Sequence, residues 1–148
     1  MKKTLLVVVL VVLLMTSLFA AERHSGIGAG LTVGFPVGVT VRYDLDFMRV
    51  VGGLSNPYGA GIWLDAGGLF PIAEVAIAEI PLFIDGGAQL SIGLNESKFY
   101  FTLNALATVS WFVETMPVEV FASLAPGFRV APSAGFSFKG GLGALYYF

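Results

Sequence analysis

Apolar and polar residues alternate along most of this chain. Every odd position from Gly26 to Phe47 is apolar, and every even position is a glycine, a proline or a polar residue. Side chains of a β-strand point alternately to its two faces, so a period of two predicts strands with one apolar face. The same alternation returns after each turn signal, over residues 80–94, 98–114, 117–128 and 135–148.

Turn-forming stretches divide the alternating region into predicted strands. "GFPVG", "SNPYG", "LNESK" and "APSAG" are rich in residues that favour turns. Strands of about 10 residues suit a tilted crossing of a lipid bilayer. The stretch "PIAEVAIAE" (71–79) fits two interpretations, an extension of two neighbouring strands or a short helical turn. The predicted strands are 26–34, 38–45, 47–54, 59–70, 80–94, 98–112, 117–128 and 135–148.

The first residues, "MKKTLLVVVLVVLLMTSLFAAE", have a different pattern. Two lysines precede an apolar run from Leu5 to Met15, and small residues follow it. This order is typical of a secretory signal peptide, here residues 1–21, cleaved after Ala20 or Ala21. The alternative is an uncleaved membrane anchor, but the run is much shorter than the roughly 20 residues of a membrane span. The mature domain is therefore expected to be 22–148.

The composition is unusual for a soluble surface. Hydrophobic residues make up 56% of the chain and charged residues only 12%, about half the share found in ordinary soluble domains. After the signal peptide, no run is long and apolar enough for a membrane helix. In lipid every backbone polar group must be satisfied within helices or a closed sheet. A closed barrel reconciles these observations.

Alternation alone does not say which face points outward. A soluble β-sandwich turns its apolar face inward, whereas a membrane barrel turns it toward lipid. The polar face here consists mostly of Gly, Thr, Ser and Asn, which suit the crowded interior of a small barrel. We therefore predict an all-β fold, an eight-stranded antiparallel up-and-down transmembrane β-barrel, with an exported soluble sandwich as the alternative. The aromatic residues near strand ends, expected to form an interfacial girdle, are Tyr43, Phe47, Tyr58, Phe70, Phe99, Trp111, Phe112, Phe128, Tyr146, Tyr147 and Phe148.

The end of the chain carries a resemblance. "GGLGALYYF" ends in Phe148, with Tyr146, Ala144 and Leu142 at the alternate positions before it. Together with the signal peptide and the eight alternating strands, this resembles the small OmpA/OmpX-like bacterial outer-membrane barrels. The opening block "GIGAGLTVGFPVGVTVRYDL" and the closing block "MPVEVFASLAPGFRVAPSAGFSFKGGLGALYYF" are similar to a family of small eight-stranded barrels of unassigned function. That family often has a glutamate where Ser123 stands and an arginine where Leu145 stands, so its interior charge pairs are not carried over.

The resemblance implies a location and partners. It implies residence in the bacterial outer membrane after export through the inner membrane, contact with outer-membrane lipid, and insertion by the barrel insertion machinery. Tyr146 and Phe148 would form the C-terminal insertion signal. Nucleic acid is an unlikely class of partner because the net charge is −2 and no basic patch occurs. We expect a monomer, and a surface ligand, if one exists, would bind weakly through short loops.

Charged residues on the polar face are the candidate functional residues. Balanced charge in a narrow bore predicts ion pairs that plug it, because an unpaired buried charge is costly. The alternative is a narrow polar channel lined by the same side chains. The bore of an eight-stranded barrel is only just wide enough for side chains, which favours the plug. These residues are Arg42, Asp44, Arg49, Asp65, Asp85, Glu119, Arg129 and Lys139.

A third function class is a lipid-modifying outer-membrane enzyme. Acyl transfer or ester hydrolysis usually needs a histidine base beside a serine. His24 is the only histidine, and it precedes the first predicted strand. The chain has no cysteine, and metal sites generally use several His or Cys ligands. We therefore predict no catalysis, no cofactor and no metal site.

Overall fold

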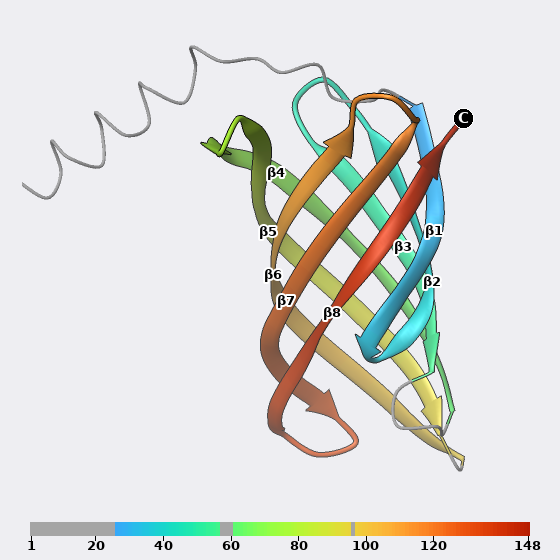
Figure 1. Cartoon of the computed structure of the whole chain (residues 1–148). Coiled ribbons are helices and arrows are strands. Elements are labelled where there is room, and N and C mark those ends of the chain that lie inside the picture. Colours follow the sequence, from blue (N-terminus) through green and yellow to red (C-terminus); the bar gives the residue numbers. More distant parts are fainter. Residues whose placement is uncertain (1–25, 57–60, 96) are drawn as a thin grey trace, which may run out of the picture.

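The computed structural model describes residues 26–56, 61–95 and 97–148. Its eight strands form one closed antiparallel barrel, in which each strand pairs with its sequence neighbours and β1 pairs with β8 (Figure 1). The predicted all-β closed barrel is therefore confirmed. The signal peptide prediction, 1–21, lies outside the described residues. The strands are β1 (Gly26–Phe35), β2 (Val37–Asp44), β3 (Arg49–Asn56), β4 (Ile62–Ile77), β5 (Ile80–Asn95), β6 (Lys98–Val113), β7 (Val118–Ala131) and β8 (Gly135–Tyr147).

The barrel has two distinct ends. β1 begins and β8 finishes at one end, which we call the terminal end (Figure 1). The connections β1–β2, β3–β4, β5–β6 and β7–β8 lie at the opposite, distal end. No helix in the described part of the chain is long and apolar enough to cross a membrane.

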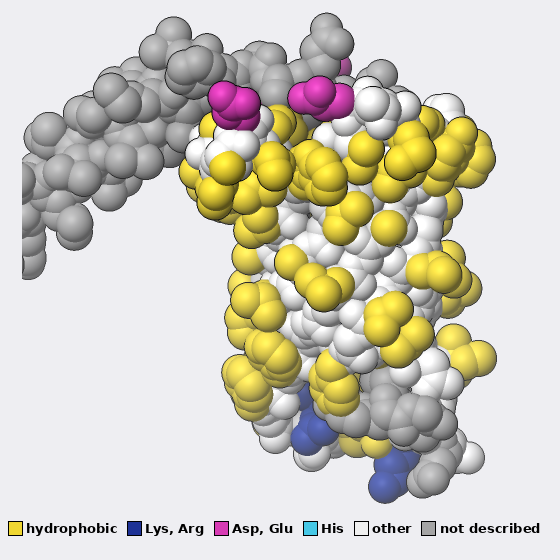
Figure 2. Space-filling model, viewed as in Figure 1, with side chains coloured by type: hydrophobic (Ala, Val, Ile, Leu, Met, Phe, Trp, Pro, Cys, Tyr) yellow, Lys and Arg dark blue, Asp and Glu magenta, His cyan; other side chains and the backbone are white. Residues whose placement is uncertain are grey.

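The apolar face of the strands points outward. Leu31 and Leu142 are 63% and 66% exposed, while polar residues of the opposite face, such as Thr102 and Ser91, are almost fully buried. Hydrophobic side chains are spread over the visible wall in Figure 2, most densely toward one end, with acidic side chains at that end and basic ones at the other. The soluble sandwich is therefore wrong, because the sheet is closed and its apolar side chains lie outside.

The segment 71–79 extends two strands, and the helical alternative is wrong. β4 continues to Ile77 and pairs with β5 up to the pair Ile77–Ile80. A β-bulge at Ile72 interrupts the ladder, because Pro71 pairs with Asp85 while Ala73 pairs with the preceding residue of β5. A bulge adds one residue to one strand only. It therefore lets the outward alternation resume beyond it.

The wall is taller on one side of the barrel. β2 and β3 have 8 residues each, whereas β4, β5 and β6 have 16 each. The β4–β5 hairpin leans outward from the side of the barrel at the terminal end (Figure 1). Its outward residues, including Val75, Ile77 and Ile80, are apolar and exposed.

Aromatic side chains fill part of the bore. Phe112 and Tyr147, expected in the girdle, are instead 5% and 4% exposed and pack with Phe83, Phe121 and Leu145 inside the barrel. Their positions follow the strand alternation, since they neighbour outward residues such as Trp111 and Tyr146. Tyr58 lies outside the described residues. The described outward aromatic residues of the expected girdle are Tyr43, Phe47, Phe70, Phe99, Trp111, Phe128, Tyr146 and Phe148.

Inward glycines make room for these rings. Gly93 pairs directly with Trp63, Gly143 with Phe121, and Gly28 with Tyr147. A Cβ atom on Gly93 would lie 2.4 Å from the Trp63 ring, and one on Gly143 would lie 2.3 Å from the Phe121 ring. Each ring therefore lies over the glycine opposite it, which lets a narrow bore hold large side chains.

Candidate functional site: the polar interior of the barrel

The eight predicted bore residues lie on inward-facing positions but form two groups and one separate residue. Five of them meet near the terminal end, two meet nearer the distal end, and Arg129 stands apart at the distal mouth. The five residues near the terminal end, which we call the terminal cluster, are Arg42, Asp44, Arg49, Asp85 and Glu119. The two residues nearer the distal end, which we call the distal pair, are Asp65 and Lys139.

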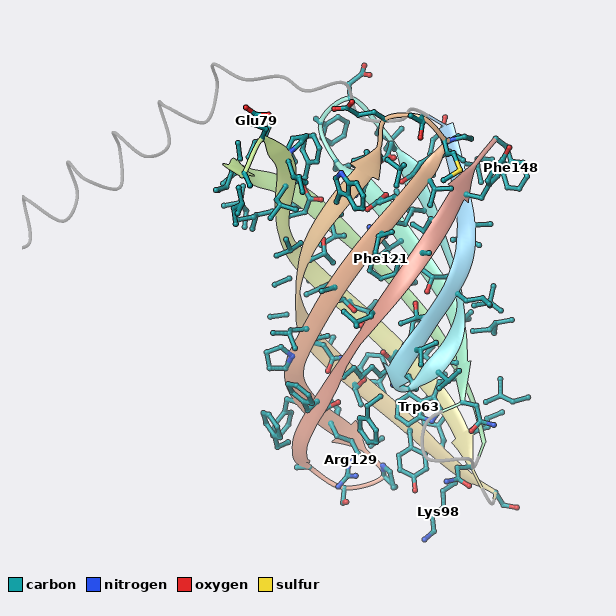
Figure 3. The ribbon with its side chains drawn as sticks, viewed as in Figure 1. Trp63, Glu79, Lys98, Phe121, Arg129 and Phe148 are labelled. Carbon is teal, nitrogen blue, oxygen red and sulfur yellow. The ribbon has the colours of Figure 1, made fainter. Side chains whose placement is uncertain are left out.

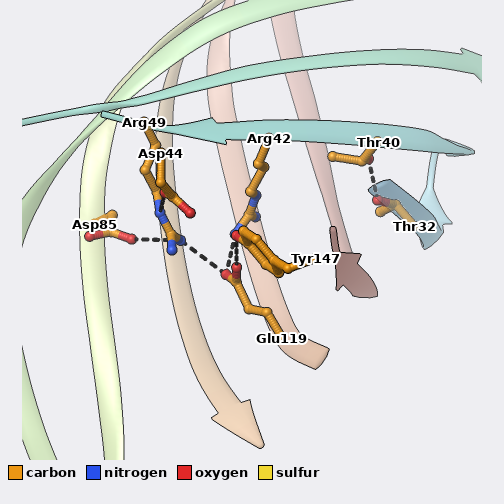
Figure 4. A network of polar contacts seen from close by, with 8 residues as sticks. All are labelled: Thr32, Thr40, Arg42, Asp44, Arg49, Asp85, Glu119 and Tyr147. Carbon is orange, nitrogen blue, oxygen red and sulfur yellow. Dashed lines mark hydrogen bonds and ion pairs between the residues drawn. The ribbon is translucent and has the colours of Figure 1, made fainter. Parts of the chain in front are cut away.

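Two arginines organise the terminal cluster (Figure 4). Arg42 donates from Nη1 to Oε1 of Glu119 at 2.5 Å. Arg49 donates to the same oxygen at 3.0 Å and to Oδ2 of Asp85 at 3.3 Å, and its Nε donates to Asp44. The side chains of both arginines are only 2% exposed. β2, β3, β5 and β7 are therefore tied together across the bore by charge-assisted hydrogen bonds.

Glu119 is the centre of this cluster. Its Oε1 accepts from both arginines, and its Oε2 accepts from the Tyr147 hydroxyl at 2.5 Å. The Arg42 guanidinium carbon lies 3.9 Å from the centre of the Phe121 ring, a cation–π contact. The carboxylate, at 0% exposure, is thus surrounded by donors that balance its charge.

The distal pair belongs to a second hydrogen-bonded group. Lys139 donates from Nζ to Asp65 at 2.5 Å and to Ser91 at 2.8 Å. Ser55 donates to the other oxygen of Asp65 at 3.1 Å. The ammonium also lies 4.8 Å from the Trp63 ring centre. Lys139 is therefore neutralised by one carboxylate and held against one indole ring.

A cavity of about 80 Å³ separates the two groups. Arg42, Phe121 and Thr108 line it on the side of the terminal cluster, and Asp65 and Lys139 line it on the distal side. Closer to the distal end, Asn104 donates to Ser91 at 3.4 Å and to Thr102 at 3.1 Å. The wall beside the cavity carries a further pair, in which the hydroxyls of Thr32 and Thr40 lie 2.7 Å apart (Figure 4).

Arg129 is the exception among the eight residues. Its Nε donates to the carbonyl oxygen of Ser133 at 3.0 Å, in the β7–β8 turn. Among the described residues, no carboxylate lies within ion-pair distance of its guanidinium. It is half-buried, whereas the other bore cations are buried.

Sequence patterns indicated the inward face but not the contacts across it. Leu145 and Tyr147 are both buried in the bore, although Tyr147 was expected in the girdle. The hydrogen bond from Tyr147 to Glu119 and the contact of Trp63 with Lys139 were not foreseen. They depend on which strand positions face each other, which alternation within one strand does not reveal.

The described carboxylates of the interior serve as hydrogen-bond acceptors for the bore cations. The carboxylates of the terminal cluster accept hydrogen bonds from arginines, and Asp65 accepts a hydrogen bond from Lys139. Among the described residues, no three Asp, Glu, His or Cys side chains are grouped so that they could hold a metal ion. His24 lies outside the described residues.

Comparisons with other proteins add no family assignment. No protein-family model, no curated protein and no solved structure matches this chain.

Proposed function

We propose that this protein is a small bacterial outer-membrane β-barrel with a structural or surface-interaction role, a bore plugged by side chains, and no catalytic activity. The observation that carries the proposal is a closed barrel whose outer wall is apolar and whose buried charges are paired inside. Its likeness to the OmpA/OmpX-like barrels, noted above from sequence motifs, is part of this proposal.

The outer wall supports a lipid environment. Exposed hydrophobic side chains occur on every strand, among them Val33, Leu64 and Leu103. In water, such an apolar surface would drive association. In lipid it is the expected exterior, and a closed sheet leaves no unpaired strand edge inside the hydrocarbon.

The two ends of the chain support export and insertion. Residues 1–21 have the pattern of a cleavable signal peptide. On β8, Tyr146 and the terminal Phe148 are 50% and 81% exposed and their rings contact each other. These two side chains are therefore accessible on the barrel exterior, as recognition by the barrel insertion machinery requires.

The contents of the bore favour a plug. The terminal cluster and the Phe83–Phe112–Phe121 rings occupy the same level of the barrel. Arg49, for example, lies between three carboxylates and 5.2 Å from the Phe112 ring centre. Moving these groups aside would leave buried charges unpaired, which is costly.

Cell fractionation tests the proposal. When the full-length chain is expressed in bacteria, the protein recovered should be in the outer-membrane fraction and should lack residues 1–21. It should run as a monomer whose mobility on a gel changes on heating. A protein found soluble in the periplasm, with mobility unchanged by heating, would contradict the proposal.

The second candidate is a narrow polar channel, favoured by the cavity of about 80 Å³ between the two charged groups. It predicts single-channel currents when the purified protein is reconstituted in a planar bilayer. The plug predicts no current in the wild type. Substitution of Arg42 and Glu119 by alanine shortens the plugging side chains and should allow current to pass.

A further inference from the structure

A second and larger cavity opens at the distal end of the barrel. Its volume is about 240 Å³, and Lys139 forms part of its floor. Trp63 and Arg129 line it and lie at this end of the barrel, away from Phe148 (Figure 3). None of the interactions that plug the terminal half of the bore extends into this cavity, which we call the vestibule.

One wall of the vestibule is aromatic and held rigidly. Trp63 is only 9% exposed, and its ring lies over Gly93, where a Cβ atom would be 2.4 Å from the ring. Its centre lies 5.5 Å from that of Tyr100, with 39° between the ring planes. Lys139 contacts the indole as well, at 4.8 Å. The indole is therefore a fixed aromatic part of the vestibule wall.

Another wall carries a cation whose terminal nitrogens are available. Arg129 is anchored through Nε to the carbonyl oxygen of Ser133, which leaves its two terminal nitrogens without a hydrogen-bond acceptor among the described residues. Gly135 makes room for the guanidinium, because a Cβ atom there would lie 3.0 Å from Nη2. A terminal guanidinium edge suits bidentate binding of a carboxylate or phosphate.

The charge balance of the vestibule is positive among the described residues. Lys139 is paired with Asp65 at 2.5 Å, so these two charges cancel. Among the described residues Arg129 has no such partner, so within that part of the chain it supplies one uncompensated positive charge. A ligand that brings one negative charge would therefore complete the pairing.

We propose that the vestibule binds a small anionic aromatic compound, with its carboxylate or phosphate on Arg129 and its ring against Trp63 and Tyr100. The size agrees with a single ring, because a cavity of about 150 Å³ holds benzene and the vestibule measures about 240 Å³. The remaining volume accommodates the acidic substituent. Thr102 and Asn95 add polar groups to the lining.

This inference goes beyond the proposed function and does not require it. Ligand binding is a property of the folded barrel in detergent, whereas the proposed location is tested by fractionation of cells. The two can therefore fail separately.

Tryptophan fluorescence provides the test. The chain has two tryptophans, and Trp111 is on the outer wall at 37% exposure. The Trp111→Phe protein, purified folded in detergent, thus reports on Trp63 alone. Titration with benzoate, and separately with phenyl phosphate, should change its emission and saturate with at least one of them.

Matched variants identify the anion-binding group. Arg129→Gln should weaken binding about tenfold or more, because a hydrogen bond to a charged group contributes about 1.5–3 kcal/mol. Arg129→Lys keeps the charge, so its affinity should lie between those of the parent protein and Arg129→Gln. Lys98→Gln is the control, since Lys98 is exposed at the same end (Figure 3) and should bind as the parent does. Heat-dependent gel mobility verifies that each variant is folded.

Several outcomes would overturn the proposal. Absence of a saturable signal with both anions would do so, and so would equal weakening by Lys98→Gln and Arg129→Gln, which would mean unspecific attraction. Phenol binding as tightly as benzoate would remove the role of the anion. Inorganic phosphate competing as well as phenyl phosphate would remove the role of the ring.

Discussion

Glu119 shows how a single carboxylate can be kept inside a barrel. It accepts hydrogen bonds from Arg42, Arg49 and Tyr147, which come from three different strands. Burying an ion is costly, and only close partners with good geometry offset that cost. Removing its charge therefore takes away the carboxylate that pairs with the buried Arg42, while Asp44 and Asp85 remain bound to Arg49.

Substitution of Glu119 by glutamine should lower the free energy of unfolding by about 3–5 kcal/mol, the usual effect of breaking a buried charge pair. Urea unfolding of the folded protein in detergent or lipid vesicles measures it. Glu114→Gln is the control, because Glu114 is exposed in the β6–β7 turn, and its effect should be close to zero. Equal stabilities of the two variants would show that the terminal cluster does not hold the barrel together.

Gly93 gives a second prediction at the scale of one residue. Gly93→Ala would place a methyl group against the rigid Trp63 ring, so we expect a loss of about 1–3 kcal/mol from overpacking. Gly52→Ala is the matched control, since the nearest atom to its Cβ would be 3.7 Å away. Urea unfolding compares the two. A tolerated Gly93→Ala would mean that Trp63 does not depend on the glycine beneath it.

The inward or outward direction of a side chain could be predicted from the sequence, but its partner could not. Alternation correctly placed Leu145 in the bore and Tyr146 on the wall. It also placed Arg42 and Glu119 on the polar face, yet 77 positions separate them. Their contact depends on the diameter of the barrel and the stagger of its strands, which a single strand does not encode.

The bulge in β4 controls which face each residue of the hairpin occupies. Before it, Phe70 is outward opposite Gly86, and Pro71 pairs with the buried Asp85. Beyond it, Glu74 pairs with the buried Phe83, which places the carboxylate on the inner side. If every residue were counted and no bulge occurred, strict alternation from Phe70 would assign Glu74 to the apolar face. The bulge thus reconciles two segments of opposite phase.

Deletion of Ile72 should therefore be tolerated, because Pro71 and Ala73 already pair with consecutive residues of β5. Deletion of Ala66, in the regular part of the same strand, should prevent folding. It would turn the buried Leu69 outward and Phe70 into the bore, since a shift of one residue exchanges the faces. Heat-dependent gel mobility after refolding distinguishes the two. Equal folding of both deletions would show that register in β4 is not set by alternation.

Strand boundaries were harder to predict than strand existence. All eight strands were expected, but β3 begins at Arg49 rather than at 47, and β4 ends at Ile77 rather than at 70. At the β2–β3 turn, the amide of Leu45 donates to the carbonyl of Met48. This turn includes Phe47, an apolar residue that continues the alternation without being part of a strand.

At the scale of the whole molecule, the outward apolar wall is the property that the proposed membrane location explains. Leu90→Arg, in the middle of β5, places a charge on this wall, where Leu90 is 45% exposed. In lipid vesicles we expect a loss of about 2–4 kcal/mol, the cost of arginine near the middle of a bilayer. Urea unfolding in vesicles measures it.

Phe136→Arg is the control for this prediction. Phe136 is 74% exposed beside the β7–β8 turn, close to the proposed interface, where an arginine costs only about 0–1 kcal/mol. A Leu90→Arg protein as stable as Phe136→Arg would argue against lipid around the barrel.

The unequal height of the wall has a consequence for how such a barrel would sit in a bilayer. Each additional strand residue adds about 3.3 Å along the strand, and β4, β5 and β6 have twice as many residues as β2 and β3. A hydrophobic belt that is deep on one flank and shallow on the other is mismatched to a bilayer of uniform thickness. The axis would then lean away from the membrane normal, or the lipid would thin beside β2 and β3, so that the β4–β5 hairpin defines a preferred direction in the plane of the membrane.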